Sequence, residues 1–151
     1  MNRTAVTEMI RVLEKVPEEK FDLRTWRRSG LMDMVREGRC GSAACAVGWA
    51  AQDPWFQAHG FKLVRGKNTG RLTPVYQDLI GWGAVSEFFD VTRNMAEYLF
   101  TPSAYPGFNA TRDQVIFRLM RVLEWESLKT DAGEGDERPR RKLLASPTQP
   151  A

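Results

Sequence analysis

Twelve consecutive uncharged residues constrain the fold more than any other stretch of this sequence. They run from Cys40 to Ala51, in a chain of which 27% is Asp, Glu, Lys or Arg. The stretch is rich in Ala, and Ser42 after Gly41 suits the N-cap of a helix that spans Ala43 to Ala51. Because small apolar residues lie on every side of this helix, we expect it to be buried. The residues expected to form this structural core are Cys40, Gly41, Ser42, Cys45, Gly48 and Trp49.

The remaining composition is that of one folded, soluble domain. A chain of 151 residues buries about two-thirds of its unfolded surface, which is enough for a core without metals or disulfides. Its two cysteines are too few for a disulfide framework and fit a reducing compartment. The sequence shows no signal peptide and no apolar run long enough for a membrane span, so we expect a cytoplasmic protein with no membrane contact.

Apolar periodicity and capping residues predict a mainly α fold. The helices expected outside the uncharged stretch are an amphipathic one from Thr4 to Val16, a short one at Pro54 capped by Asp53, one that ends at Asp90, one from Arg93 to Phe100 capped by Thr92, and a long one behind the capping box Thr111–Gln114 that ends near Lys129. The expected architecture is a monomeric or weakly associating helical domain of residues 1–129. Residues 130–151, with three prolines and no aromatic residue, are expected to be a disordered tail.

One small two-stranded β-hairpin is expected within the helical domain. Residues 61–65 and 71–76 have strand-like composition, and the Gly- and Asn-containing loop between them is typical of a hairpin turn. Pro74 lacks a backbone N–H, so we expect the second strand to lie at an edge of the sheet.

Two motifs follow one another in the first third of the chain. Residues 21–26 read FDLRTW, and residues 40–50 read CGSAACAVGWA. They resemble the FD-x-x-x-W element and the CGT-x-x-C-x-x-G-W/H-A signature of a group of uncharacterised small bacterial and phage proteins, and the likeness extends over about residues 5–125. Ser42 stands where the group usually has Thr, and residues 27–39 are an insertion. The group has no assigned activity, so the resemblance implies a mostly helical fold and a phage or mobile-element setting, and no reaction.

The cysteines are the strongest candidates for chemistry, and the sequence argues against both a thiol enzyme and a metal site. Cys40-Gly41-Ser42 is similar to the CGSC-W signature of papain-like proteases, but no Trp follows directly. The only histidine, His59, follows Cys45 closely instead of far downstream. Cys40, Cys45 and His59 supply three ligands where a structural zinc site needs four. We therefore expect no catalytic residue, no metal, no cofactor and no enzyme activity.

Basic residues form the candidate binding surface. The chain has a formal net charge of +3. The candidate residues lie in the insertion and around the hairpin, and they are Arg27, Arg28, Arg36, Arg39, Lys62, Arg65, Lys67 and Arg71. Our leading hypothesis is a non-enzymatic phage or mobile-element protein that binds a bacterial protein or nucleoprotein, with inhibition of a defence complex as one form of this function. A nucleic-acid-binding accessory protein, which would use the basic hairpin, is the first alternative. A thiol-dependent enzyme is the second.

Overall fold

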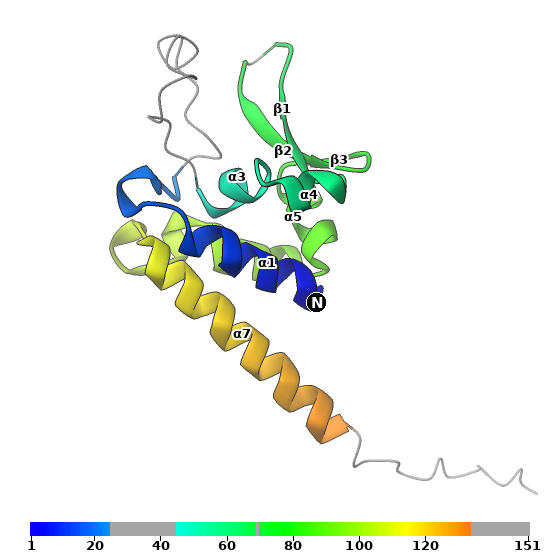
Figure 1. The fold of residues 1–151 in the computed structure, drawn as a ribbon, viewed down its shortest axis with the longest axis vertical. Helices are drawn as coiled ribbons and strands as arrows, with labels where there is room; N and C mark the ends of the chain where they lie inside the picture. The colour runs from blue at the N-terminus through cyan, green and yellow to red at the C-terminus, as the bar shows by residue number, and fades with distance from the viewer. Residues whose placement is uncertain (25–44, 69, 134–151) are drawn as a thin grey trace, which may run out of the picture.

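The computed structural model describes residues 1–24, 45–68 and 70–133, and these form a mostly helical body with a small antiparallel sheet (Figure 1). The elements in chain order are α1 (Arg3–Glu14), η1 (Glu18–Lys20), α3 (Ala46–Ala50), α4 (Pro54–Ala58), β1 (Lys62–Arg65), β2 (Leu72–Tyr76), β3 (Leu79–Ile80), α5 (Trp82–Phe89), α6 (Arg93–Phe100), η2 (Pro102–Ala104), η3 (Pro106–Phe108) and α7 (Arg112–Gly133). The predicted mainly α class is confirmed. None of the helices described is long and apolar enough to cross a membrane.

The body is built on the antiparallel pair α1 and α7 (Figure 1). At one end of the pair, Nη1 of Arg3 donates to the carbonyl of Leu123 at 3.1 Å. At the other end, Nη1 of Arg112 donates to the carbonyl of Val16 at 2.6 Å. Helices α3 and α5 also pack on α1, and one buried core joins these helices with α4, α6 and α7. Its largest side chains are Phe56, Phe61, Phe89, Phe100, Met9, Leu13, Leu99 and Leu119.

Capping residues place most helix ends where the sequence predicts them. The side chain of Asp53 accepts a hydrogen bond from the backbone amide of Trp55 and begins α4, and the hydroxyl of Thr92 accepts one from Met95 and begins α6. Asp90, in the left-handed conformation, ends α5. Helix α7 runs to Gly133, past the predicted end near Lys129, so residues 130–133 belong to the helix and not to the predicted tail. Residues 134–151 lie outside the described part of the chain.

The central uncharged helix begins later than the sequence predicts. Helix α3 starts at Ala46, and its N-cap is Cys45, whose Sγ accepts a hydrogen bond from the backbone amide of Gly48 at 3.3 Å. The prediction of one continuous helix over residues 43–51 is wrong, because the extended backbone angles of Cys45 interrupt it. Cys45 and Gly48 are buried and Trp49 is half-buried. Cys40, Gly41 and Ser42 lie outside the described residues.

The sheet has three strands, so the prediction of a two-stranded hairpin is wrong. Strands pair in the order β1-β2-β3, and a two-residue turn with Gln77 at φ 53° leads into β3. Strand β2 is therefore central, and the prediction that Pro74 confines it to an edge is also wrong. The carbonyl of Pro74 faces β3 and accepts a hydrogen bond from Gly81 at 2.8 Å. Pro74 has no N–H to donate in return, and the pairing of β2 with β3 ends one residue before it, at Val75 and Ile80.

Candidate binding surfaces

Cys45 belongs to the buried core and lacks the properties of a reactive thiol. Cys45 is 2% exposed, and burial raises the pKa of its thiol to about 12. The thiolate, which is the nucleophilic form, is therefore scarce at neutral pH. The Sγ atom instead caps α3. The first cysteine of the predicted core, Cys40, lies in residues 25–44, which the structure does not describe.

His59, the third ligand considered for a metal site, is exposed at the end of α4. Its Nδ1 lies 2.7 Å from the carbonyl of Trp55, and its ring stacks on the Trp55 indole with centroids 4.1 Å apart. Within the described residues, no three His, Cys, Asp or Glu side chains are grouped to hold a metal ion.

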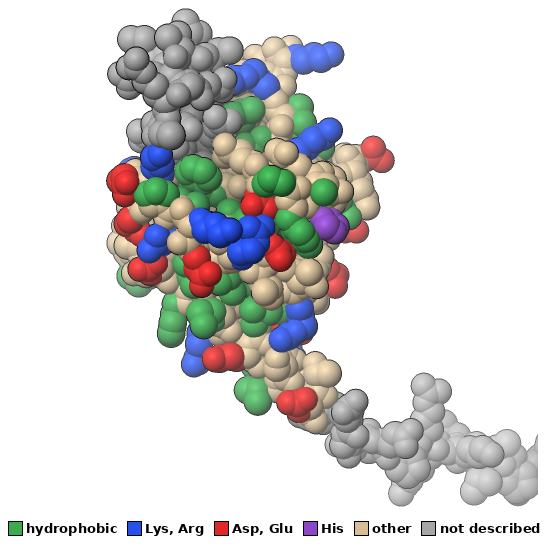
Figure 2. All heavy atoms as spheres, in the orientation of Figure 1, with side chains coloured by type: hydrophobic (Ala, Val, Ile, Leu, Met, Phe, Trp, Pro, Cys, Tyr) green, Lys and Arg blue, Asp and Glu red, His purple; other side chains and the backbone are tan. Residues whose placement is uncertain are grey.

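The four basic residues predicted around the hairpin are exposed, and the hairpin extends from the body on the side opposite α7 (Figure 1). They are Lys62, Arg65, Lys67 and Arg71. Nη1 of Arg65 donates to the carbonyl of Gly70 at 2.7 Å, so this guanidinium also closes the hairpin loop. In Figure 2, Lys and Arg side chains mark the far end of the hairpin. The other four predicted binding residues, Arg27, Arg28, Arg36 and Arg39, fall outside the described residues.

The strand register gives the sheet an apolar outer face. Paired residues point to the same side of a sheet and alternate along each strand. The outer sheet face therefore consists of Lys62, Val64, Thr73, Val75 and Ile80. Val64 and Ile80 are exposed, Ile80 by 69%. The opposite face packs on the body, where the ring of Tyr76 meets Phe88 edge-on with centroids 5.0 Å apart.

Sequence reasoning missed this apolar face because it missed β3. The turn residues Gln77 and Asp78 include neither Gly nor Asn, the residues that usually indicate a two-residue hairpin turn. Without β3, Ile80 has no neighbour in the sheet. The sequence did offer one signal in β1. Successive strand residues point to opposite faces, so an inward Leu63 leaves its neighbours Lys62 and Val64 facing outward.

Helix α7 has a second apolar surface on the side away from the core. Its buried residues are Val115, Leu119 and Val122. The outer face of α7 consists of four exposed or half-exposed residues, Phe117, Met120, Trp125 and Leu128, of which Phe117 and Leu128 are both 66% exposed. Figure 2 shows hydrophobic side chains protruding on this free side of the helix. The sequence predicts one apolar stripe made of Val115, Ile116, Leu119, Met120, Val122 and Leu123. Met120 lies instead on the outer face, which sequence reasoning overlooked.

A groove runs between α7 and the segment that holds α6, η2 and η3. Its cavity of about 520 Å³ is lined by apolar and aromatic residues and by two arginines, among them Tyr98, Tyr105, Phe117, Arg118 and Arg121. The Arg118 guanidinium lies 3.6 Å from the centroid of the Tyr105 ring and 4.1 Å from that of Tyr98. The Tyr105 hydroxyl donates to the carbonyl of Leu99 at 2.7 Å, and burial raises its pKa to about 12. These contacts fix the wall of the groove.

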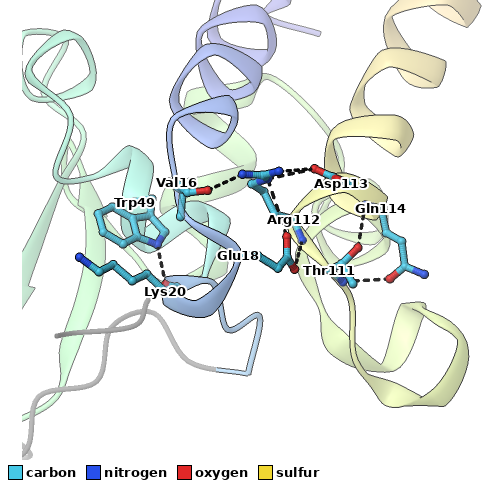
Figure 3. Close-up of polar contacts among 8 residues, drawn as sticks. All are labelled: Val16, Glu18, Lys20, Trp49, Thr111, Arg112, Asp113 and Gln114. Carbon is cyan, nitrogen blue, oxygen red and sulfur yellow. Dashed lines mark hydrogen bonds and ion pairs between the residues drawn. The ribbon is translucent and has the colours of Figure 1, made fainter. Parts of the chain in front are cut away.

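Arg112, the first residue of α7, bonds the start of this helix to the segment that follows α1. Figure 3 shows Arg112 donating from its side chain to the carbonyl of Val16, while its backbone amide donates to Glu18 at 3.1 Å. Beside it, the hydroxyl of Thr111 accepts from the amide of Gln114, and the Gln114 side chain accepts from the amide of Thr111 at 2.9 Å, so the predicted capping box is confirmed (Figure 3). In the same view, Nε1 of Trp49 donates to the carbonyl of Lys20 at 3.1 Å.

Comparison with models of protein families, with curated proteins and with solved structures found no match to this chain.

Proposed function

We propose that this chain is a non-enzymatic binding protein of phage or mobile-element origin that engages a bacterial protein or nucleoprotein, such as a defence complex, through the outer sheet face and the basic residues around it. The origin rests on the resemblance of residues 5–125 to small bacterial and phage proteins. The binding surface rests on the sheet.

The observation that carries the proposal is the combination of apolar and basic residues on one projecting element. Val64 and Ile80 expose apolar side chains on the outer sheet face, and Lys62 lies in the same row as Ile80 through the pairing of both with Val75. An apolar centre with a charged border is the usual make-up of a protein-binding surface. The basic border would attract an acidic partner and speed its association.

Binding of nucleic acid alone is the second candidate. The basic residues of the hairpin favour it, and the positions of the aromatic side chains argue against it. Lys62, Arg65, Lys67 and Arg71 offer cations for phosphates. Single-stranded nucleic acid also needs aromatic platforms, each worth about 1–3 kcal/mol per base. The described residues of the outer sheet face include no aromatic side chain, and Tyr76 of β2 is turned toward Phe88.

The thiol-dependent enzyme is the weakest reading for Cys45. A buried thiol with a pKa of about 12 supplies neither access nor a thiolate.

A pull-down from bacterial host lysate, with and without nuclease, tests the proposal. We expect a retained protein that survives nuclease treatment and is lost in the variants Val64→Asp and Ile80→Asp. Phe108→Asp is the matched control, because Phe108 is also an exposed apolar residue but lies in η3, away from the sheet. This control should retain the partner.

Reversing the charges of Lys62, Arg65, Lys67 and Arg71 separates the two candidates. For a protein partner, the reversal mainly slows association. For nucleic acid, binding falls with salt at a log–log slope approaching about −3 for four phosphate contacts, and the reversal abolishes it. A partner that is lost on nuclease treatment, together with such a slope and unaffected binding by Ile80→Asp, would replace the proposed function by the second candidate.

A further inference from the structure

The free side of α7 carries a pair of opposite charges with an apolar residue at each end. Four residues with the spacing four, three, four lie along the side of α7 that faces away from the core. We name them the outer stripe: Phe117, Arg121, Glu124 and Leu128. This spacing is that of a coiled-coil seam. Along the stripe the order is apolar, positive, negative, apolar.

The two charges of the stripe have no partner in the part of the chain that the structure describes. Arg121 and Glu124 make no hydrogen bond or ion pair with a described residue, whereas neighbouring Lys129 is paired with Glu126 at 3.7 Å. Both are exposed on α7, next to the apolar Phe117 and Leu128. The stripe therefore offers both signs of charge and apolar area at once.

We propose that the outer stripe is the contact of a homodimer in which two copies of α7 pack antiparallel around a two-fold axis between Val122 and Leu123. An axis at this point places Phe117 opposite Leu128 of the second copy and Arg121 opposite its Glu124, because both pairs are centred there. Each copy contributes both halves of each pair. A second copy is thus the partner whose charges match the stripe twice over.

The edges of the stripe fit the same arrangement. Met120 and Trp125 lie on opposite sides of the stripe, at about equal distances along the helix from the axis. Both are half exposed in the single chain, and the Trp125 ring carries the Lys129 ammonium 3.7 Å from its centroid. In the dimer they cover the two margins of the seam, as residues beside a coiled-coil core do.

The shape of the body leaves room for the second copy. The Arg3–Leu123 hydrogen bond marks where α1 begins, so the last turns of α7 extend past α1, and Figure 1 shows the end of α7 projecting from the body. In an antiparallel pair, the projecting end of one copy lies beside Phe117 of the other. There the groove of about 520 Å³ lined by Tyr105 and Phe117 can receive Leu128.

Charge exchange tests both the dimer and its register by sedimentation equilibrium of the full chain over a range of concentrations. The parent is expected to approach twice the chain mass of 17.2 kDa as concentration rises. Arg121→Glu alone and Glu124→Arg alone each place like charges together twice, so both should weaken dimerisation at least tenfold. The double variant, which carries both changes, restores opposite charges and should recover the parent's association.

Matched variants keep the result independent of folding. Lys15→Glu makes the same change of charge as Arg121→Glu, but at an exposed site at the C-terminal end of α1. It should leave the dimer unchanged. Leu128→Asp should give a monomer whose circular dichroism and melting match the parent at low concentration.

Three outcomes would overturn the proposal. One is a parent that stays monomeric at every concentration. The second is a dimer that the double variant fails to restore after both single variants weaken it, since the register would then differ. The third is a full chain that is monomeric while a chain without residues 134–151 dimerises, because those residues would then be the occupant of the outer stripe.

Discussion

Helices α1 and α7 lie side by side and share one core, yet their outward surfaces differ in chemistry. The exposed residues of α1 are polar, and they are Arg3, Thr4, Thr7 and Glu14. The outer face of α7 carries Phe117, Met120, Trp125 and Leu128. Both helices bury a full apolar stripe on the inside, including Leu13 in α1 and Leu119 in α7.

The difference lies in the apolar area that each helix leaves exposed, which is small on α1 and large on α7. Helix α1 packs its single apolar stripe on α3, α5 and α7 and exposes no large apolar side chain. Neighbouring exposed apolar residues, as on the outer face of α7, are typical of an interaction surface. The described body covers the inner stripe of α7 and leaves its outer face exposed, so that face is the candidate interface.

The largest expected effect concerns the buried apolar stripes, which α1 and α7 have in common. Leu13→Ala and Leu119→Ala should each lower the free energy of unfolding by about 2–5 kcal/mol, because both side chains are fully buried and leave a cavity. Urea denaturation monitored by circular dichroism measures this loss. A Leu119→Ala variant that unfolds at the same urea concentration as the parent would show that α7 does not pack on α1 as described.

A second test concerns the buried contact between α1 and α3, where Cys45 lies. In a Cys40→Ser background, Cys45 should react with a thiol reagent at pH 8 far more slowly in the native protein than in denaturant, because the thiol is both inaccessible and protonated. Fast native reaction would mean that α3 opens readily.

The pKa of Cys45 also sets the sign of a pH effect on stability. Its folded pKa, about 12, is raised from the ordinary value of 9.0, so the unfolded chain loses this proton first as pH rises. The stabilising contribution is complete below about pH 9 and is lost as pH rises toward 12. Cys45→Ala should remove this part of the alkaline destabilisation, as pH-dependent melts would show.

A third, smaller effect distinguishes the first turns of the two helices. Asn2→Ala should cost about 1–2 kcal/mol, since Oδ1 of Asn2 accepts from Ala5 at 3.1 Å while Nδ2 donates to the carbonyl of Phe88. Thr111→Ala should cost about 0.5–1 kcal/mol, because Gln114 continues to accept from the amide of residue 111. Equal losses in denaturant titrations would show that the bond to Phe88 contributes nothing.

Local signals in the sequence were enough for the parts of the fold that local contacts determine. Asp53, Thr92 and the Thr111–Gln114 box each bond backbone groups within three residues, and each begins the helix it was expected to begin. The start of α3 was different. Ser42 was the expected cap by residue type, whereas α3 begins at Ala46 and is capped by the buried Cys45 thiol.

The features that sequence reasoning missed depend on contacts between distant or unexpected elements. Strand β3 is held by pairing with β2 and by packing near α5, with Gln77 in a conformation that its residue type rarely adopts. The outer face of α7 had a sequence signal in Phe117 and Leu128. Deciding which stripe of such a helix meets the body required the position of α1, and this is not encoded within α7 itself.

The smallest effect decides whether the difference between α1 and α7 has a consequence beyond the single chain. At low protein concentration, Leu128→Ala should change the free energy of unfolding by less than about 0.5 kcal/mol, because an exposed side chain loses little on truncation. At high concentration, association stabilises the folded parent by mass action, so its melting temperature should rise with concentration. The rise should be smaller in Leu128→Ala and unchanged in Thr7→Ala, the matched truncation on the outer side of α1. If parent and both variants show the same dependence on concentration, the apolar outer face of α7 contributes nothing to association, and the contrast between the two helices ends at their surface chemistry.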